Sequence, residues 1–180
     1  MVPTVVEAVK PVPVIAAGGI ATGRGLVAAL SLGAQAVSMG TRFLASEEAH
    51  VVHAYKERLV QSKAEDTVYT LLFDIGWPDA AHRVLRNKVV AEWETAGRPP
   101  SGQRPGEGNI IGTMPIAETT MEMVKYMVYP PLTGFTGDID EAVLYAGESC
   151  GLVRDVKPAA QIVQDVVREA EEVIAELQRR

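Results

Sequence analysis

The sequence predicts an α/β fold, namely the last two strand–helix units of a (β/α)8 barrel. Two segments predict it, Val14-Ile-Ala-Ala-Gly-Gly-Ile20 and Val37-Ser-Met-Gly-Thr-Arg-Phe43, because each is a short apolar strand that ends in glycine and opens a helix. A single helix between them requires a right-handed crossover and therefore parallel pairing of the two strands. In such barrels, consecutive turns of this kind after the last two strands hold a phosphate group.

The elements expected over residues 1–76 follow the alternation of a strand–helix repeat. In order, they are the end of a helix over 3–10, a strand over 12–17, a helix over 22–32, a strand over 36–39, a helix from Ser46 to about Val60 and a strand over 67–73. The first strand is continuously apolar, which is typical of a strand buried on both faces. Gly33 stands where a helix ends in a left-handed residue.

After Trp77-Pro78 this alternation stops, and residues 77–180 are expected to form a mostly helical appendage. Its expected elements are a helix over 83–93, a turn-rich connection over 97–108, a short helix over 138–145, a glycine-rich loop over 146–151 and an amphipathic helix from 157 to the end. Methionines at 114, 121, 123 and 127 are expected to fill a second small core. The whole is a partial fold, since a complete barrel needs about 250 residues.

The chemistry of phosphate binding explains why the two turns carry small residues. A Cβ atom at Gly18, Gly19 or Gly40 would stand where a phosphate oxygen has to approach the main chain. The N–H groups that follow, at the start of a helix, are donors for an anion, and Thr41 adds a hydroxyl donor. Either turn alone is an ordinary strand–helix connection, but the pair on adjacent strands predicts a phosphate site.

Charge and composition exclude several classes of protein. With 17 Lys and Arg against 23 Asp and Glu, the net charge of −6 argues against a nucleic-acid partner and an anionic-membrane partner. No apolar run approaches the roughly 18 residues that span a bilayer, and no leader precedes the first strand, so a cytoplasmic protein is expected. The single cysteine, Cys150, excludes an internal disulfide and a cysteine-rich metal site. A small buried filler is expected there, with a reactive thiol as the alternative.

The histidines suggest no metal site. His50 and His53 lie three residues apart on an expected helix, so a metal pair is conceivable. Lys56 and Arg58 follow closely, however, and favour a solvated position for this face. We therefore expect no bound metal.

Several motifs resemble the carboxyl-terminal portion of the nitronate monooxygenase family, formerly called 2-nitropropane dioxygenases. They are Pro13-Val-Ile-Ala-Ala-Gly-Gly-Ile-Ala21, Gly23-Arg-Gly25, Met39-Gly-Thr-Arg-Phe43, Phe73-Asp-Ile-Gly-Trp-Pro78, Leu85-Arg-Asn87 and Tyr145-Ala-Gly-Glu-Ser-Cys-Gly-Leu152. The resemblance covers almost the whole chain. It implies an FMN-dependent barrel in which the flavin takes electrons from an alkyl nitronate and reacts with dioxygen, giving a carbonyl compound and nitrite.

The resemblance also implies roles for particular residues. It implies that FMN is bound by Gly18, Gly19, Ser38, Met39, Gly40, Thr41 and Gly147. It also implies that Ser149 contacts the substrate. Two positions depart from the family pattern. Ser38 stands where glutamine is common, and Glu148, also usually glutamine, would put a carboxylate near an anionic substrate unless it turns away.

No catalytic residue is expected in this chain. The family's proton-abstracting histidine lies in a glycine-rich loop after an earlier strand, and none of His50, His53 and His82 lies in such a loop. The resemblance thus implies that the chain needs the family's amino-terminal barrel half for activity, and it allows a homo-oligomer. Without that half, the apolar strands would expose surface that parallel strands normally cover.

Two alternatives stay open beside the nitronate monooxygenase. The first is an FMN-dependent enoyl-acyl-carrier-protein reductase, which shares the Gly-Gly-Ile and Met-Gly-Thr motifs but reduces a thioester-activated double bond with a nicotinamide donor. The second is an inactive truncated fragment that folds poorly or serves as an interaction module. The Tyr145-Ala-Gly147 loop favours the monooxygenase over the reductase.

Overall fold

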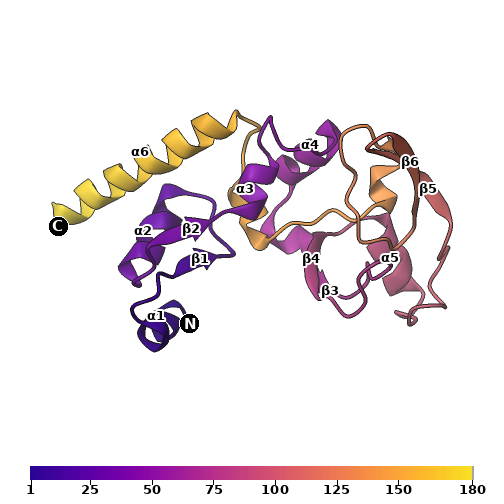
Figure 1. Ribbon diagram of the computed structural model, residues 1–180, viewed down its shortest axis with the longest axis horizontal. Coiled ribbons are helices and arrows are strands. Elements are labelled where there is room, and N and C mark those ends of the chain that lie inside the picture. Colours follow the sequence, from indigo (N-terminus) through magenta and orange to yellow (C-terminus); the bar gives the residue numbers. More distant parts are fainter. Residues whose placement is uncertain (180) are drawn as a thin grey trace.

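The computed structural model describes residues 1–179 and is made of two regions side by side (Figure 1). We call residues 1–45 the strand–helix unit and residues 51–153 the antiparallel lobe. The last helix, α6 (Ala159–Gln178), turns back from the lobe and lies along α2 of the strand–helix unit. None of the helices within residues 1–179 is long and apolar enough to cross a membrane.

The strand–helix unit has the predicted order of elements. They are α1 (Val2–Val9), β1 (Ile15–Ala17), α2 (Gly23–Ser31), β2 (Ala36–Ser38) and the short α3 (Gly40–Leu44). Strands β1 and β2 pair in parallel, as the short crossover required. Thr22 caps α2 by accepting a hydrogen bond from the Gly25 N–H at 3.2 Å, and Gly33 follows the helix with the expected positive φ of 95°.

The prediction that the first strand is buried on both faces is wrong for the chain as described. In β1 only Ala16 is buried, and the side chain of Ile15 is 63% exposed. The reason is that this sheet has two strands and only one covered face. That face packs in a small cluster of Ala16, Ala29 and Ala34, with Val2, Ile20 and Val37 at its edge.

The antiparallel lobe contains two small sheets. Its elements are α4 (His53–Gln61), a 3-10 turn η1 (Ala64–Asp66), β3 (Thr67–Thr70), β4 (His82–Leu85), α5 (Lys88–Thr95), β5 (Ile110–Ile116), β6 (Thr119–Val124), β7 (Thr136–Gly137) and the 3-10 turns η2 (Ile139–Glu141) and η3 (Glu148–Leu152). Strands β3 and β4 pair antiparallel, and β5 lies between β6 and β7 in the second sheet, also antiparallel.

Two predicted helices begin later than expected. The helix placed from Ser46 starts at His53, because the backbone of Val51 and Val52 bonds to the segment around Pro131 instead. Ser46 closes a turn by accepting from the Ala49 N–H at 3.2 Å. The helix placed over 83–93 was wrong in its first half, since 82–85 form β4 and the helix begins only after Asn87, whose side chain accepts from the Val90 N–H.

The prediction that the part after Trp77-Pro78 is mostly helical was also wrong. Residues 110–124 form a β-hairpin, turned at Ala117 with a positive φ of 52° and rich in β-branched threonine, which favours strands. The helix expected over 138–145 is a single 3-10 turn at Ile139–Glu141. The residues after it are extended because they pair with β4, where the Leu85 N–H donates to the Leu144 carbonyl at 2.8 Å. Only α5 and α6 are α-helices in this part of residues 77–179.

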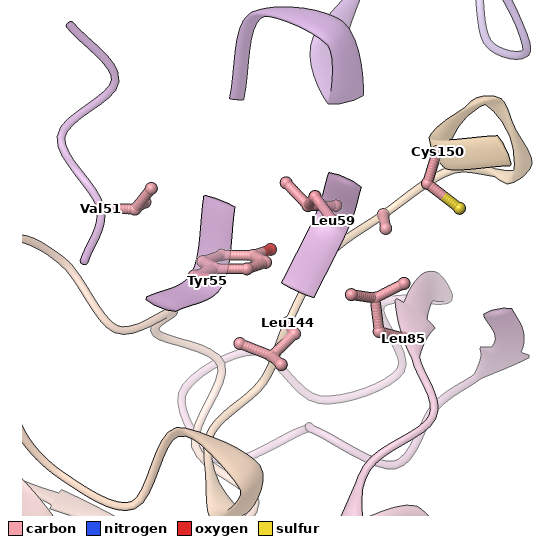
Figure 2. Packing of buried hydrophobic residues seen from close by; sticks show 7 residues of the cluster. Val51, Tyr55, Leu59, Leu85, Leu144 and Cys150 are labelled. Atoms are coloured by element: carbon pink, nitrogen blue, oxygen red, sulfur yellow. The ribbon is translucent and has the colours of Figure 1, made fainter. Parts of the chain in front are cut away.

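The core of the described chain lies in the antiparallel lobe. One cluster joins α4, β4 and the segment after η2, and Figure 2 shows its side chains: Val51, Tyr55, Leu59, Leu85, Leu144, Ala146 and Cys150. The methionines behave as predicted, since Met114 and Met123 are fully buried in a second cluster and the other two lie at its edge. Cys150 is a buried filler, as expected, and burial raises the pKa of its thiol, which disfavours the reactive thiolate.

Candidate functional site

The two glycine turns lie at the same end of the parallel sheet. The register of β1 and β2 pairs Ala17 with Ser38, so Gly18 and Met39 leave neighbouring strands at one level. This confirms the prediction that both turns share one edge, which follows from parallel pairing. The backbone that follows each strand end therefore faces the same space.

Glycine is needed in the first turn for its backbone conformation and leaves open space in front of it. Gly18 and Gly19 have φ values of 91° and 74°, which residues with a side chain rarely adopt. A Cβ placed on either residue would meet no atom within 4 Å. Gly40 also has open space where a Cβ would stand, and its φ is ordinary for a helix start. The main chain of both turns is thus bare and accessible.

A third segment closes on these turns through Thr41. The N–H of Gly147 donates to Thr41 Oγ1 at 3.0 Å, and a Cβ on Gly147 would come within 3.4 Å of the same oxygen. Because Thr41 accepts from Gly147, its hydroxyl hydrogen stays available to donate elsewhere. The loop that starts at Tyr145 is therefore fixed against the end of β2.

The same loop is anchored from its other side by the antiparallel lobe. The Tyr55 hydroxyl donates to the Tyr145 carbonyl at 2.6 Å, and the Ala146 N–H donates to the Arg83 carbonyl at 3.1 Å. Burial raises the pKa of the Tyr55 phenol well above its usual value, so it stays a neutral donor. Helix α4 and strand β4 thus hold the loop in position relative to the strand–helix unit.

The other residues expected at the FMN and substrate site differ in how exposed they are. Ser38 is exposed at the end of β2, whereas Met39 is buried, with 8% of the residue exposed, so its side chain is not open to a ligand. Ser149 is 4% exposed and lies next to Gly147. Glu148 forms an ion pair with Arg83, whose Nη2 lies 3.1 Å from a carboxylate oxygen.

The histidines belong to other segments than the glycine turns. His50 is exposed, and His53 begins α4 with its Nε2 3.4 Å from a carboxylate oxygen of Glu57. His82 opens β4 and is partly buried. Within residues 1–179, no group of three or more His, Cys, Asp or Glu side chains could hold a metal ion.

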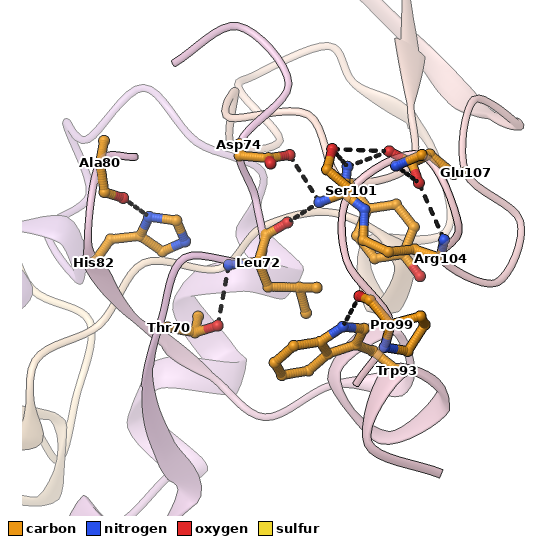
Figure 3. Close-up of polar contacts among 12 residues, drawn as sticks. Thr70, Leu72, Asp74, Ala80, His82, Trp93, Pro99, Ser101, Arg104 and Glu107 are labelled. Atoms are coloured by element: carbon orange, nitrogen blue, oxygen red, sulfur yellow. Dashed lines mark hydrogen bonds and ion pairs between the residues drawn. The ribbon is translucent and has the colours of Figure 1, made fainter. Parts of the chain in front are cut away.

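Two arginines without a role predicted from the sequence are buried and hold carboxylates. Arg42, directly after Thr41, is buried and donates to the carbonyl and a carboxylate oxygen of Asp155 at 3.0 and 2.9 Å. It thereby ties the second turn to the segment before α6. Arg104 is buried in the lobe and holds Asp74 at 2.7 Å and Glu107 (Figure 3). No sequence signal distinguishes these arginines from exposed ones.

An aromatic pocket lies on the lobe beside the anchored loop. Its volume is about 460 Å³, and its lining residues are Trp77, Ala80, Ala81, His82, Val128, Tyr129 and Tyr145. Tyr145 belongs both to this pocket and to the loop that contacts Thr41. The sequence gives no sign of this pocket, because its walls come from three separate segments.

Comparison with known proteins gives consistent results. The model of the nitronate monooxygenase family matches residues 1–169. The nitronate monooxygenase npaC of Metarhizium robertsii is 34% identical over 97% of this chain, which covers 46% of that protein. A (3aS,4S,5R,7aS)-5-hydroxy-7a-methyl-1-oxo-octahydro-1H-indene-4-carboxyl-CoA dehydrogenase of Mycobacterium tuberculosis is 46% identical over 54% of this chain and 27% of its own length.

Two solved structures share the fold of this chain. FabK from Thermotoga maritima superposes with a TM-score of 0.73 at 32% identity over 98% of this chain and 50% of its own. A nitroalkane oxidase from Streptomyces ansochromogenes gives a TM-score of 0.67 at 26% identity, over 98% of this chain and 44% of its own. The chain spans about half the length of npaC and of both structures. By its motifs, its fold and these matches, the chain belongs to the nitronate monooxygenase family of oxidoreductases.

Proposed function

We propose that this chain supplies the phosphate-binding part of an FMN site, in an enzyme that oxidises alkyl nitronates with dioxygen to a carbonyl compound and nitrite. The observation that carries the proposal is the pair of bare glycine turns at one end of a parallel sheet, closed by the loop that bonds to Thr41. When bound, FMN would take electrons from the nitronate and pass them to dioxygen.

The residues at the turns fit a phosphate group. Backbone N–H groups after Gly18 and Gly19, the N–H groups at the start of α3 and the Thr41 hydroxyl are donors, and a phosphate oxygen accepts such bonds. Arg42, the nearest cation in sequence, is engaged with Asp155. Backbone dipoles and one hydroxyl, rather than a bound arginine, would therefore hold the anion in this proposal.

The loop after Tyr145 would position the reacting part of the substrate. Gly147 lies against Thr41, so it stands next to the proposed phosphate position, and Ser149 follows it. In this proposal the Arg83 cation, 3.1 Å from the Glu148 carboxylate, offsets the negative charge that would otherwise repel an anionic nitronate. No histidine within residues 1–179 lies at the glycine turns, and the proposal assigns no proton-abstracting residue to this chain.

Full activity in this proposal needs residues of the family's amino-terminal half. Phosphate contacts alone hold a cofactor weakly, because burial of the flavin ring would supply much of the affinity at about 25 cal/mol per Å². The outer face of β1, with Ile15 exposed, is the surface that such a half would cover.

Flavin binding to the 180-residue chain tests the proposal. FMN and riboflavin differ in the phosphate alone, so we expect FMN to bind at least about tenfold more tightly, measured by fluorescence titration. Equal dissociation constants would contradict the phosphate assignment. Oxygen consumption with propyl nitronate and excess FMN tests the rest: we expect activity only when the amino-terminal half is added, and a turnover of about 10 s⁻¹ by the chain alone would overturn that requirement.

A thioester substrate is a second candidate. The similarity to FabK and to a CoA dehydrogenase favours it, since the resemblance to an enoyl-acyl-carrier-protein reductase implies a thioester-activated double bond. The two candidates differ in their electron donor. NADH should bleach the flavin of a reductase under anaerobic conditions and leave the flavin of a monooxygenase oxidised.

A further inference from the structure

The peptide unit between Tyr145 and Ala146 is held at both of its polar ends. The Tyr55 hydroxyl donates to the Tyr145 carbonyl at 2.6 Å, and the Ala146 N–H donates to the Arg83 carbonyl at 3.1 Å. A peptide unit is planar, and its C=O and N–H point in opposite directions, so these two bonds fix its orientation. The N–H that follows, on Gly147, therefore starts from a fixed plane.

The position of the Tyr55 hydroxyl is set by the core of the antiparallel lobe. Tyr55 is fully buried on α4 and packs in one cluster with Leu59, Leu85 and Leu144 (Figure 2). Phenylalanine would fill the same space except for the hydroxyl, so the packing of this cluster does not require a tyrosine. The hydroxyl joins the cluster to the loop, through the bond to the Tyr145 carbonyl.

At the other end of the loop, the bond from Gly147 limits the direction of the Thr41 hydroxyl. A hydroxyl has one hydrogen to donate and two lone pairs that accept. The Gly147 N–H occupies a lone pair of Thr41 Oγ1 at 3.0 Å, so the hydroxyl hydrogen has to point away from Gly147. Under the proposed function this hydrogen is donated to a phosphate oxygen, as a hydrogen bond strengthened by the charge of the anion. Its direction thus decides whether Thr41 contributes to phosphate binding.

We propose that Tyr55 is a positioning residue of the phosphate site. Its hydroxyl holds the loop so that Gly147 stays on Thr41, and the Thr41 hydroxyl hydrogen stays directed to the flavin phosphate. Tyr55 lies in the core of the lobe and acts through these two residues rather than by touching the flavin. The inference rests on the proposed function and adds a requirement to it, because the affinity for the phosphate then depends on a hydroxyl group of α4.

Two buried tyrosines make a matched pair for the test. Tyr126 is also fully buried, and its hydroxyl donates to the Pro105 carbonyl at 2.9 Å, but it belongs to a different cluster of the core. Tyr55→Phe and Tyr126→Phe each remove one such hydrogen bond, so each should lower the thermal midpoint by about 2–4 °C. A tyrosine that stabilises the core alone should have no further effect.

Tyr55→Phe should have two effects that Tyr126→Phe lacks. In the chain without flavin, the amide hydrogen of Gly147 should exchange with solvent at least about fivefold faster, measured by NMR. In fluorescence titrations, the preference for FMN over riboflavin should fall about three- to tenfold, because riboflavin has no phosphate and should bind as before. Equal changes in the two variants, or an unchanged exchange of Gly147 in Tyr55→Phe, would overturn the inference.

A double variant tests whether Tyr55 acts through Thr41. Thr41→Val keeps the shape of the side chain and removes the hydroxyl, so by itself it should lower the preference for FMN about three- to tenfold. Tyr55→Phe should then lower it no further, because two substitutions that remove the same interaction are not additive. A second loss of about the same size in the double variant would show that Tyr55 acts by another route, and would overturn the inference.

One measurement needs no variant, and it decides even if Tyr55→Phe does not fold. Coupling is reciprocal, so FMN should slow the exchange of the Gly147 amide and of the Tyr55 hydroxyl hydrogen in the unaltered chain, whereas riboflavin should not. Unchanged exchange of the Tyr55 hydroxyl would contradict the inference. Equal binding of FMN and riboflavin by the unaltered chain would overturn the proposed function and this inference together. A preference for FMN that Tyr55→Phe leaves unchanged would overturn the inference alone.

Discussion

The strand–helix unit and the antiparallel lobe differ in the size of the side chains that they bury. In the unit, Ile15, Leu30 and Leu32 are exposed and the buried cluster consists of alanines. In the lobe, Tyr55 and Phe73 are fully buried in clusters of large side chains. Stability in the described chain therefore resides in the lobe, whereas the candidate phosphate turns lie on the region with the weaker core.

A few contacts, made by α6, Arg42 and the loop at Gly147, join the strand–helix unit to the rest of the chain. Helix α6 packs on α2, where a Cβ on Gly23 would lie 2.4 Å from the Ala170 backbone nitrogen. The Gly23 N–H donates to a carboxylate oxygen of Glu169 at 2.7 Å. Arg42 and the loop at Gly147 add two more contacts. The lobe and its last helix thus support the turns that the unit cannot stabilise alone.

The largest effect should come from truncating the core of the lobe. Phe73→Ala removes a fully buried ring and should lower the free energy of unfolding by about 3–5 kcal/mol. Ile15→Ala, on the exposed face of β1, should change it by less than about 0.5 kcal/mol. Urea unfolding followed by circular dichroism measures both. Similar losses in the two variants would show that the regions do not differ in this way.

A smaller effect should follow from separating α6 from the unit. Gly23→Ala places a methyl group against the backbone of α6, so one helix must move, at a cost of about 1–3 kcal/mol. Hydrogen exchange should then increase in α2 and β1 and stay unchanged in the buried strands of the lobe. Faster exchange throughout the chain would contradict a local link.

Acid should weaken the lobe through Glu107. The hydrogen bond from Arg104 lowers the pKa of Glu107 to about 2, below the value of 4.5 for a free carboxyl group. A lowered pKa means that this contribution is complete above about pH 5 and is lost as the pH falls toward 2. After allowance for solvent at this partly exposed group, we expect a loss of about 2 kcal/mol. Glu107→Gln should remove this part of the pH dependence in urea titrations at pH 7, 4 and 3, and an unchanged slope would contradict it.

The elements that could be predicted from sequence are those with a local signal. The apolar run before Gly18, the cap at Thr22 and the positive φ at Gly33 are each encoded within a few residues, and the parallel pairing follows from one short crossover. The strand at His82–Leu85 could not be predicted in this way. This strand is extended because it pairs with β3 and with Leu144, which is far away in the sequence. Tertiary pairing therefore outweighs the local propensity of these residues.

The candidate site also has features that the sequence predicts and features that only the three-dimensional structure shows. Gly18 and Gly19 carry a local signal because their backbone conformation limits the residue type, whereas Gly40 has an ordinary φ and was chosen for the open space that a phosphate needs. The contact of Gly147 with Thr41 and the pocket around His82 join segments that are distant in sequence, so only the three-dimensional arrangement shows them. The ion pair of Glu148 with Arg83 likewise joins residues that are far apart in the sequence.

Replacement of Gly40 by alanine tests most directly whether the bare turns bind the flavin phosphate. Gly40 starts α3 with an ordinary φ and open space, so Gly40→Ala should keep or raise the thermal midpoint, because alanine favours helix over glycine by up to about 1 kcal/mol. Gly97→Ala is the opposite control: its φ of 81° makes alanine destabilising by about 1 kcal/mol, far from the turns. We predict that the dissociation constant for FMN rises at least about tenfold in Gly40→Ala and stays unchanged in Gly97→Ala. An unchanged FMN affinity in a folded Gly40→Ala chain would contradict the account.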